Sequence, residues 1–197
     1  WTLELTVNDQ VLTPRADTET LVEWALEIEL PPKARVIDLC TGSACIAAAL
    51  ASERPDWQLA ATELSADAFA LAQTNLTDLD YSDRVQLHQG DLFAGLEGPF
   101  DLIVANPPYI APSEAEGLDP EVRQYEPAIA LFAQEEGLEI IKRIAMESPA
   151  RSESGAWLLV EHGHQQGPAV RTFLKEAGYE SICTRRDLGQ RERITGG

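Results

Sequence analysis

Basic residues are scarce in this 197-residue chain, which holds 15 Lys and Arg against 33 Asp and Glu and carries a formal net charge of −18. A protein that binds DNA or RNA normally presents a basic face, because phosphate neutralisation supplies most of its affinity. The charge therefore argues against nucleic acid as the partner. One basic cluster is predicted to consist of solvated strand and loop charges, with a partner contact as the alternative; its members are Arg185, Arg186, Arg191 and Arg193.

Long apolar runs and cysteines are also in short supply. No apolar stretch reaches the roughly 18 residues that a membrane-spanning helix needs, and nothing resembles a signal peptide. The cysteines, Cys40, Cys45 and Cys183, are too few and too scattered for a disulfide framework. His162 and His164 have no third ligand nearby, so no metal site is expected. We predict a cytoplasmic protein with reduced thiols and no membrane partner.

Short apolar runs do alternate regularly with helical stretches after residue 31. Strands are predicted at residues 35–39, 59–63, 85–89, 100–106, 155–161, 180–185 and 191–195, and helices at 44–53, 66–79, 136–148 and 167–178. This alternation implies βαβ units and a parallel sheet with helices on both faces. The last two strands, with only "RDLGQ" between them, can pair antiparallel at an edge. The prediction is a doubly wound α/β domain with a mostly parallel seven-stranded sheet over residues 31–197.

The first 30 residues have a different pattern. "LELTVNDQVL" alternates apolar and polar residues around Asn8-Asp9, which predicts a β-hairpin. Asp17 or Thr18 is expected to cap the helix that follows. Residues 1–30 are thus predicted to form a hairpin and a helix that lead into the main domain. The start at Trp1 suggests a domain excised from a longer protein.

The first strand-to-helix turn, "DLCTGSACIA", is a candidate ligand site, because open α/β sheets bind ligands outside the carboxyl ends of their strands. Asp38 ends the strand, Gly42 permits a tight turn, and the small Ser43 and Ala44 let the backbone approach a ligand closely. A full G-x-G-x-x-G loop is missing, and no lysine follows, so a P-loop is excluded. A plain tight turn is the alternative.

Acidic residues end the next two strands. Glu63 follows Gly42 by 21 residues, a spacing at which a carboxylate can accept hydrogen bonds from both ribose hydroxyls. Asp91 and Leu92 end the third strand, where a carboxylate beside an apolar side chain could hold an adenine edge. A surface glutamate and a loop-capping aspartate are the alternatives. A nucleoside site without phosphate-binding groups favours S-adenosylmethionine as the cofactor.

The fourth strand ends in "NPPY". Prolines fix φ near −65°, so Pro107 and Pro108 form a stiff turn that can hold the Asn106 side chain and the Pro107 carbonyl as two adjacent acceptors. Two acceptors match the two donors of an –NH₂ group. Tyr109 can then lie flat over an attached amide or base. These residues are predicted to be catalytic; a proline turn that merely ends a strand is the alternative.

The whole chain resembles the HemK/PrmC family, the release factor glutamine methyltransferases. The resemblance rests on "LTPRADTETLVEWAL", "DLCTGSACIA", "NPPYI", "YEPAIAL", "LLVEHGHQQGPAVRTFLKEAGY" and "RDLGQRERIT". It implies a Rossmann-like class I fold and methyl transfer from S-adenosylmethionine to the glutamine N5 of the Gly-Gly-Gln motif in class I peptide chain release factors. Such proteins carry an N-terminal helical substrate-binding domain, which we expect to be absent here.

Motif positions in this family imply roles for individual residues. Cofactor contacts are expected from Asp38, Cys40, Thr41, Gly42, Ser43, Ala44, Glu63, Asp91, Leu92 and Asn106, and substrate contacts from Asn106, Pro107, Pro108 and Tyr109. Arg123 and Glu126 lie in the loop after the motif, which is predicted to be a lid that faces the substrate. An ordered surface loop is the alternative. Arg15 either stabilises this region or contacts substrate.

Three other functions compete with release factor methylation. Methylation of a glutamine in a large-subunit ribosomal protein would use the same chemistry. The related family that catalyses it also has the sequence "CTGS" in this turn. An adenine amino group in nucleic acid would also fit "NPPY", but the charge of −18 argues against it. The third alternative is a non-catalytic cofactor-binding subunit, which would have no need for the two adjacent acceptors of an intact "NPPY".

Overall fold

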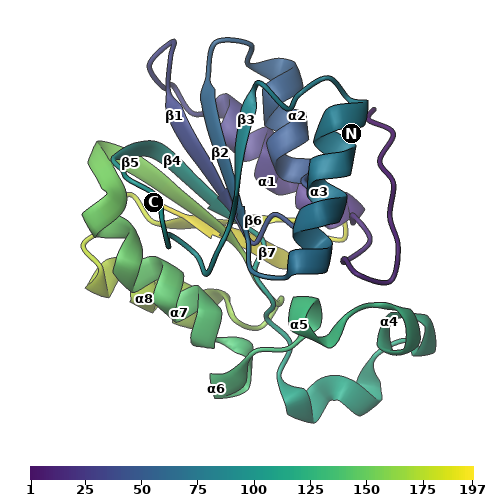
Figure 1. Cartoon of the computed structure of the whole chain (residues 1–197). Coiled ribbons are helices and arrows are strands. Elements are labelled where there is room, and N and C mark those ends of the chain that lie inside the picture. Colours follow the sequence, from purple (N-terminus) through teal and green to yellow (C-terminus); the bar gives the residue numbers. More distant parts are fainter.

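The computed structural model describes residues 1–197 and contains one seven-stranded sheet of order β3-β2-β1-β4-β5-β7-β6 (Figure 1). The strands are β1 Arg35–Leu39, β2 Gln58–Glu63, β3 Val85–Gln89, β4 Phe100–Ala105, β5 Ser152–Glu161, β6 Cys183–Arg186 and β7 Glu192–Gly196. β1 to β5 pair in parallel, whereas β7 runs antiparallel to both β5 and β6. The predicted doubly wound sheet with an antiparallel edge pair is confirmed.

Helices cover both faces of this sheet (Figure 1). The longer ones are α1 Ala16–Glu27, α2 Cys45–Glu53, α3 Ala66–Asp78, α7 Glu139–Glu147 and α8 Gly167–Glu176. The shorter ones are η1 Pro112–Gly117, α4 Pro120–Tyr125, α5 Ala128–Leu131, α6 Gln134–Gly137 and η2 Ser148–Arg151. α1, α2 and α3 pack on one face, and α7 and α8 on the other. None of the helices is both long and apolar enough to cross a membrane.

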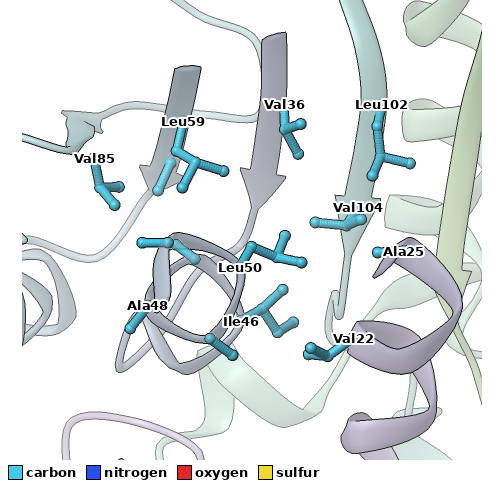
Figure 2. Close-up of a cluster of buried hydrophobic side chains, with 14 of the residues drawn as sticks. Val22, Ala25, Val36, Ile46, Ala48, Leu50, Leu59, Val85, Leu102 and Val104 are labelled. Atoms are coloured by element: carbon cyan, nitrogen blue, oxygen red, sulfur yellow. The ribbon is translucent and has the colours of Figure 1, made fainter. Parts of the chain in front are cut away.

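Each central strand sends alternate side chains into two separate cores. In β4, Leu102 and Val104 join the core under α1 and α2 (Figure 2). Ile103 between them packs with residues of α7 and α8 in the second core. All three are fully buried. A strand covered on both faces reads as a continuous apolar run, which is why these strands were recognisable. Each such side chain stabilises the fold by roughly 1.5–3 kcal/mol, so the sheet is a rigid base for its carboxyl edge.

The predicted N-terminal hairpin is wrong. Residues 1–15 form no strand, and only a turn at Asp9 remains of the expected pattern. The Asn75 side chain on α3 accepts from the Thr6 N–H (2.8 Å) and donates to the Thr6 carbonyl (3.0 Å), so a side chain replaces the partner strand. The alternation arises because Leu3 and Leu5 are half-buried on one side of an extended segment.

The predicted cap of the first helix is also wrong. α1 begins at Ala16, and Arg15 occupies the N-cap position without a side-chain capping bond. Asp17 and Thr18 therefore lie inside the first turn. Their side chains are used in tertiary contacts instead, since Asp17 pairs with Arg193 and Thr18 receives a hydrogen bond from Asn106.

Candidate active site

A pocket of about 280 Å³ lies at the carboxyl ends of β1 to β4. It is lined by most of the residues that the sequence singled out: Cys40, Thr41, Gly42, Ser43, Glu63, Asp91, Leu92, Asn106 and Pro108. These residues are scattered along the chain but share one rim, because parallel strands all end at the same edge of the sheet. The other predicted site residues do not line it: Asp38, Ala44, Pro107, Tyr109, and Arg123 and Glu126 in and after α4.

The turn after β1 has an unusual backbone. Cys40, Gly42 and Ala44 all have positive φ, at 58°, 56° and 65°. Only glycine adopts this region freely, and residues with a Cβ carry a strain of roughly 1–3 kcal/mol each, which proteins retain chiefly at functional sites. A Cβ built on Gly42 would meet no atom within 4 Å. The turn therefore presents an open backbone face to a ligand.

Asp38 holds this turn from below. Its Oδ2 accepts hydrogen bonds from the Thr41 hydroxyl (2.5 Å) and the Ala47 N–H (3.2 Å), which join the turn to the first residues of α2. The other oxygen, Oδ1, is buried and has no partner. Burial raises the pKa of Asp38 to about 7. In this structure Asp38 shapes the turn and does not line the pocket.

Glu63 faces the pocket from the end of β2. Its two oxygens accept the backbone N–H groups of Gly42 and Ser65, each at 2.9 Å. A carboxylate has about four lone-pair sites, so each oxygen retains the capacity to accept a further donor. This arrangement suits the recognition of a diol.

Asp91 has a partner that the sequence did not reveal. Arg143 of α7 donates to both of its oxygens, with Nη2 2.8 Å from Oδ2 and Nη1 3.3 Å from Oδ1. The two residues are 52 positions apart, and only the packing of α7 against the sheet joins them. Leu92 beside them is buried and has a positive φ of 48°. The predicted adenine subsite thus consists of an ion-paired carboxylate next to an apolar wall.

The roof of the pocket comes from segments that the sequence did not mark as cofactor-binding. Ile129 and Phe132 line it from the loop after "NPPY", and Ile140 lines it from α7. This loop returns to its own start, because Ile110 pairs with Phe132 and its N–H donates to the Leu131 carbonyl at 2.9 Å. We call residues 111–132 the lid. Apolar roofs carry no sequence signature that distinguishes them from ordinary core.

Arg15 and Glu126 tie the lid to the N-terminal segment. Arg15 Nη2 lies 2.6 Å from Glu126 Oε1, and the Glu126 side chain is only 8% exposed. Arg15 also lines the pocket. Arg123 is exposed and has no ion-pair partner. The structure therefore gives Arg15 a stabilising contact and buries the Glu126 side chain, and substrate contacts by Arg123 and Glu126 stay a prediction.

Asn106 supplies the acceptor that the sequence predicted. Its Nδ2 donates to the Thr18 hydroxyl at 3.2 Å, while its Oδ1 is buried without any partner. Buried polar atoms in proteins nearly always have hydrogen-bond partners. An orphaned acceptor on the wall of a pocket therefore indicates a ligand donor. Pro107 next to it is buried, and no N–H of the chain donates to its carbonyl.

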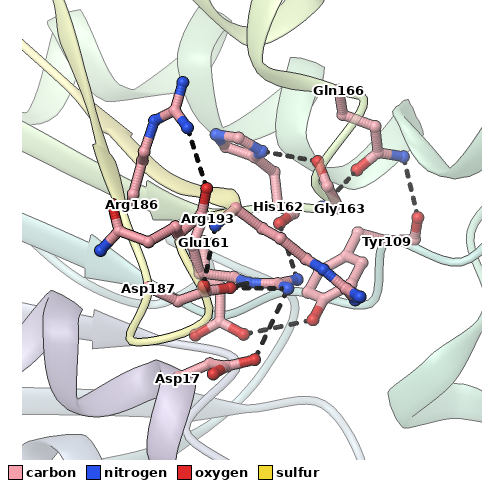
Figure 3. Close-up of polar contacts among 11 residues, drawn as sticks. Asp17, Tyr109, Glu161, His162, Gly163, Gln166, Arg186, Asp187 and Arg193 are labelled. Carbon is pink, nitrogen blue, oxygen red and sulfur yellow. Dashed lines mark hydrogen bonds and ion pairs between the residues drawn. The ribbon is translucent and has the colours of Figure 1, made fainter.

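Tyr109 is held at both ends (Figure 3). Its hydroxyl donates to Glu161 Oε1 (3.2 Å) at the end of β5, and its carbonyl accepts from Gln166 Nε2 (2.9 Å). Gly137, with a φ of 80°, packs so closely that a Cβ there would lie 2.0 Å from the Tyr109 oxygen. The ring does not line the pocket in this structure, and its stacking on an acceptor stays a prediction.

The basic cluster is partly buried, which corrects the prediction of solvated charges. Arg193 is only 8% exposed and lies 3.0 Å from Asp187 and 3.5 Å from Asp17 (Figure 3). Arg185 lies over the Trp24 ring, 4.5 Å from its centroid, and pairs with Glu27 at 2.7 Å. Arg186 and Arg191 remain exposed. Arg185 and Arg193 both contact α1 and thereby join it to the sheet edge.

The two histidines do not converge. His162 is buried, with Nδ1 2.8 Å from the Gly163 carbonyl oxygen and Nε2 2.8 Å from the Thr195 hydroxyl. His164 is exposed. No group of three or more His, Cys, Asp or Glu side chains is arranged to hold a metal ion. His162 thus serves to fix the end of β5.

The fold and the pocket define a class of protein. Residues 17–119 match the methyltransferase small domain family. The catalytic domain of human METTL16, solved in complex with MAT2A 3′UTR hairpin 6, has a TM-score of 0.81 at 20% identity over 98% of this chain and 74% of its own. A methyltransferase from Pyrococcus furiosus has a TM-score of 0.73 at 17% identity, over 98% and 87%. The chain is a methyltransferase with the class I fold, whose cofactor is S-adenosylmethionine.

More similar relatives identify the family within this class. Proteins named release factor glutamine methyltransferase are 43% identical in Xylella fastidiosa, over 100% of this chain and 72% of the relative, and 43% identical in Escherichia coli, over 99% and 70%. The Shewanella oneidensis relative is 42% identical over 100% and 68%. This chain belongs to the release factor glutamine methyltransferase family.

Proposed function

We propose that this chain transfers a methyl group from S-adenosylmethionine to the side-chain N5 of the glutamine in the Gly-Gly-Gln motif of class I peptide chain release factors. The observation that carries the proposal is the buried, partnerless Oδ1 of Asn106 on the wall of the pocket. A primary amide offers two N–H donors, and this atom requires one. The names of the family relatives supply the acceptor.

The pocket residues fit the cofactor. Glu63 would accept the ribose hydroxyls, and the open face of Gly42 would admit the methionine portion. Leu92 and Ile140 would enclose the adenine, beside Asp91. When bound, S-adenosylmethionine supplies an electrophilic methyl on a sulfonium centre. The turn has no lysine and no glycine-rich phosphate loop, which agrees with a cofactor that carries no phosphate.

We call Asn106, the Pro107 carbonyl and Tyr109 the acceptor clamp. This clamp addresses the main chemical difficulty of the reaction, the low nucleophilicity of an amide nitrogen. An amide nitrogen is a poor nucleophile, because its lone pair is delocalised into the carbonyl. Hydrogen bonds from its two N–H groups to Asn106 Oδ1 and the Pro107 carbonyl would favour a pyramidal nitrogen and stabilise the positive charge that develops on it. Preorganised polar groups of this kind are each worth about 10²–10³ in rate. The proton leaves readily after alkylation, so no general base is required.

Charge favours a protein acceptor over a nucleic acid. An adenine amino group would satisfy the same two acceptors, but the chain carries a net charge of −18. Arg193 is buried and paired with Asp187, and the partly exposed Arg185 is paired with Glu27, so neither offers an unpaired cation to phosphates. We also propose a cytoplasmic location, which the three unpaired cysteines support.

The test incubates the chain with methyl-labelled S-adenosylmethionine and a purified release factor, with the Gln→Ala variant of its Gly-Gly-Gln motif as the control. We expect label on the wild-type factor alone, and an initial rate of labelling about 10²–10³ lower when the chain carries Asn106→Ala. Label on both factors, or equal label with Asn106→Ala, would contradict the proposal. Parallel reactions with total ribosomal protein and with nucleic acid would reveal a different acceptor.

A further inference from the structure

Glu161 lies next to the acceptor clamp, although no role in the reaction has been given to it. β4 and β5 pair in parallel, with Ala105 opposite Val160. The next residue on each strand is therefore Asn106 on one side and Glu161 on the other. The Glu161 side chain is almost fully buried at this rim, and its Oε2 has no hydrogen-bond partner. A buried carboxylate is costly, so its retention beside the clamp calls for a physical account.

Thr18 connects Glu161 to Asn106. Its hydroxyl oxygen accepts the Asn106 Nδ2–H at 3.2 Å. The same hydroxyl lies close enough to Glu161 to lower the pKa of that carboxyl. A hydroxyl has one hydrogen to donate. Because Thr18 receives the Asn106 N–H on its oxygen, that hydrogen remains available to Glu161.

Tyr109 makes the second connection. Its hydroxyl donates to Glu161 Oε1 (Figure 3). Glu161 therefore accepts from Tyr109 directly, and its free Oε2 can accept the hydrogen of the Thr18 hydroxyl that holds Asn106. We propose that Glu161 is a positioning residue which, through Thr18, keeps the Asn106 amide oxygen directed at the acceptor. The inference rests on the proposed methyl transfer to an amide nitrogen.

The protonation state of Glu161 decides how Thr18 is oriented. An ionised carboxylate can only accept, so Thr18 must donate to it and accept from Asn106. This leaves Asn106 Oδ1 for the substrate. A protonated Glu161 can donate to Thr18, whose hydrogen then turns to Asn106. That arrangement favours a flipped Asn106 amide, whose oxygen accepts from Thr18. The Asn106 NH₂ group would then face the N–H donors of the substrate.

The charged groups around Glu161 determine where this change occurs. Burial has the largest effect and raises the pKa of Glu161 to about 7. Thr18, Arg193 of β7 and Tyr109 lower this pKa, whereas the charge of Asp17 on α1 raises it. The active form is the carboxylate. The rate of methyl transfer should therefore fall as the pH decreases through about 7.

The test compares kcat and KM across pH 5.5 to 9 for wild type, Thr18→Val, Thr18→Ser and Glu161→Gln. Thr20→Val is the matched control, because Thr20 is buried in the same helix and makes no hydrogen bond to the clamp. We expect Thr18→Val to lower kcat about tenfold, the effect of one hydrogen bond, with KM for S-adenosylmethionine unchanged. Thr18→Ser should stay within about twofold of wild type, since it keeps the hydroxyl, and Thr20→Val should match it.

The acidic limb of the pH profile is the decisive readout. It should be present in wild type, Thr18→Ser and Thr20→Val, and absent in Glu161→Gln and Thr18→Val. A limb that persists in Glu161→Gln, or full activity of Thr18→Val, would overturn the inference. A purely structural role for Thr18 would lower activity and leave the limb in place, which would also overturn it.

A second measurement does not require methyl transfer. The side-chain amide signals of Asn106 in ¹⁵N-labelled protein, assigned by their loss in Asn106→Ala, should shift with a midpoint near pH 7 in wild type and not in Thr18→Val. Absence of this coupling refutes the inference even if the enzyme is active. Its presence in a chain that methylates no release factor would support the coupling and refute the proposed function instead.

Discussion

The two halves of the pocket are built differently. In the cofactor half, at the ends of β1 and β2, polar side chains bond mostly to groups near them in the chain. Asp38 Oδ2 accepts from the Thr41 hydroxyl and the Ala47 N–H, 3 and 9 positions on. Glu63 accepts from the N–H groups of Ser65, 2 positions on, and Gly42, 21 positions back. In the acceptor half, the partners are distant. Thr18 and Asn106 are 88 positions apart, and Tyr109 and Glu161 are 52 apart.

The halves also differ in what they leave open. On the acceptor side, Asn106 Oδ1 and Glu161 Oε2 are buried without partners. On the cofactor side, both oxygens of Glu63 are already held by backbone N–H groups, and the partnerless Asp38 Oδ1 does not belong to the pocket lining. The turn after β1 and its contact with Glu63 form once β1 and β2 have paired. The acceptor clamp, in contrast, requires α1, β4, β5 and β7 to be packed together. We infer that the turn after β1 and Glu63 are preorganised largely by local structure, whereas Asp91 and the acceptor half depend on tertiary structure.

The largest expected effect is that of Asn106→Ala, which removes the orphaned acceptor. We expect kcat to fall by about 10²–10³, as for other preorganised polar groups, because the amide nitrogen loses one of its two acceptors. The affinity for S-adenosylmethionine, measured by calorimetry, should change by less than about threefold if the Glu63 cradle is independent. A parallel loss of cofactor binding would remove the distinction between the halves.

Gly137→Ala should have the next largest effect, because it forces a Cβ against the Tyr109 carbonyl. We expect the free energy of unfolding, measured in urea, to fall by about 3 kcal/mol, and methyl transfer to fall with it. Gly155→Ala is the matched control: its φ is 81°, against 80° for Gly137, but a Cβ there meets no atom within 4 Å. It should cost only about 1 kcal/mol of backbone strain. Equal losses for both variants would show that the Tyr109 contact is not tight.

A smaller effect is expected when the lid is released. Arg15→Ala leaves Glu126 largely buried without its cation, so the lid should open more often. We expect S-adenosylmethionine to dissociate about fivefold faster in stopped-flow experiments, the effect of a partly exposed ion pair. Arg123→Ala, from the exposed side of the same lid, should leave the dissociation rate as it is. Unchanged rates in both variants would mean that the lid does not control cofactor exchange.

The smallest effect concerns pH and the turn after β1. The folded-state pKa of Asp38 is raised to about 7, above the roughly 3.9 of an unfolded chain. Its contribution to stability is therefore complete below pH 4 and is lost as the pH rises through about 7. In wild type the free energy of unfolding should therefore decrease between pH 5 and 8. We expect this decrease to be about 1 kcal/mol smaller in Asp38→Asn. A decline as steep as in wild type would assign the pH dependence to other groups, Glu161 among them.

The outcome for individual elements shows what local pattern can and cannot predict. Continuous apolar runs such as residues 100–105 predicted central strands correctly, because burial on both faces leaves no other pattern. The alternation of residues 3–12 predicted a hairpin that does not exist. Alternation reports only that one side of an extended segment is buried, and here Asn75 took the place of a partner strand. Arg193 was expected in solvent, since a sequence does not show which carboxylates a long side chain will reach.

The sequence by itself determined the order of the strands along the chain, the turn with Gly42, and the places of Glu63 and "NPPY" at the ends of β2 and β4. These features depend on periodicity and on the backbone limits of single residues, which are local properties. Only the tertiary structure decided that Thr18 holds the Asn106 amide, that Glu161 holds Tyr109, and that Arg15 holds the lid. Each of these contacts joins residues more than 50 positions apart, and each exists because side chains buried at one rim must find partners among whichever elements the packing brings there.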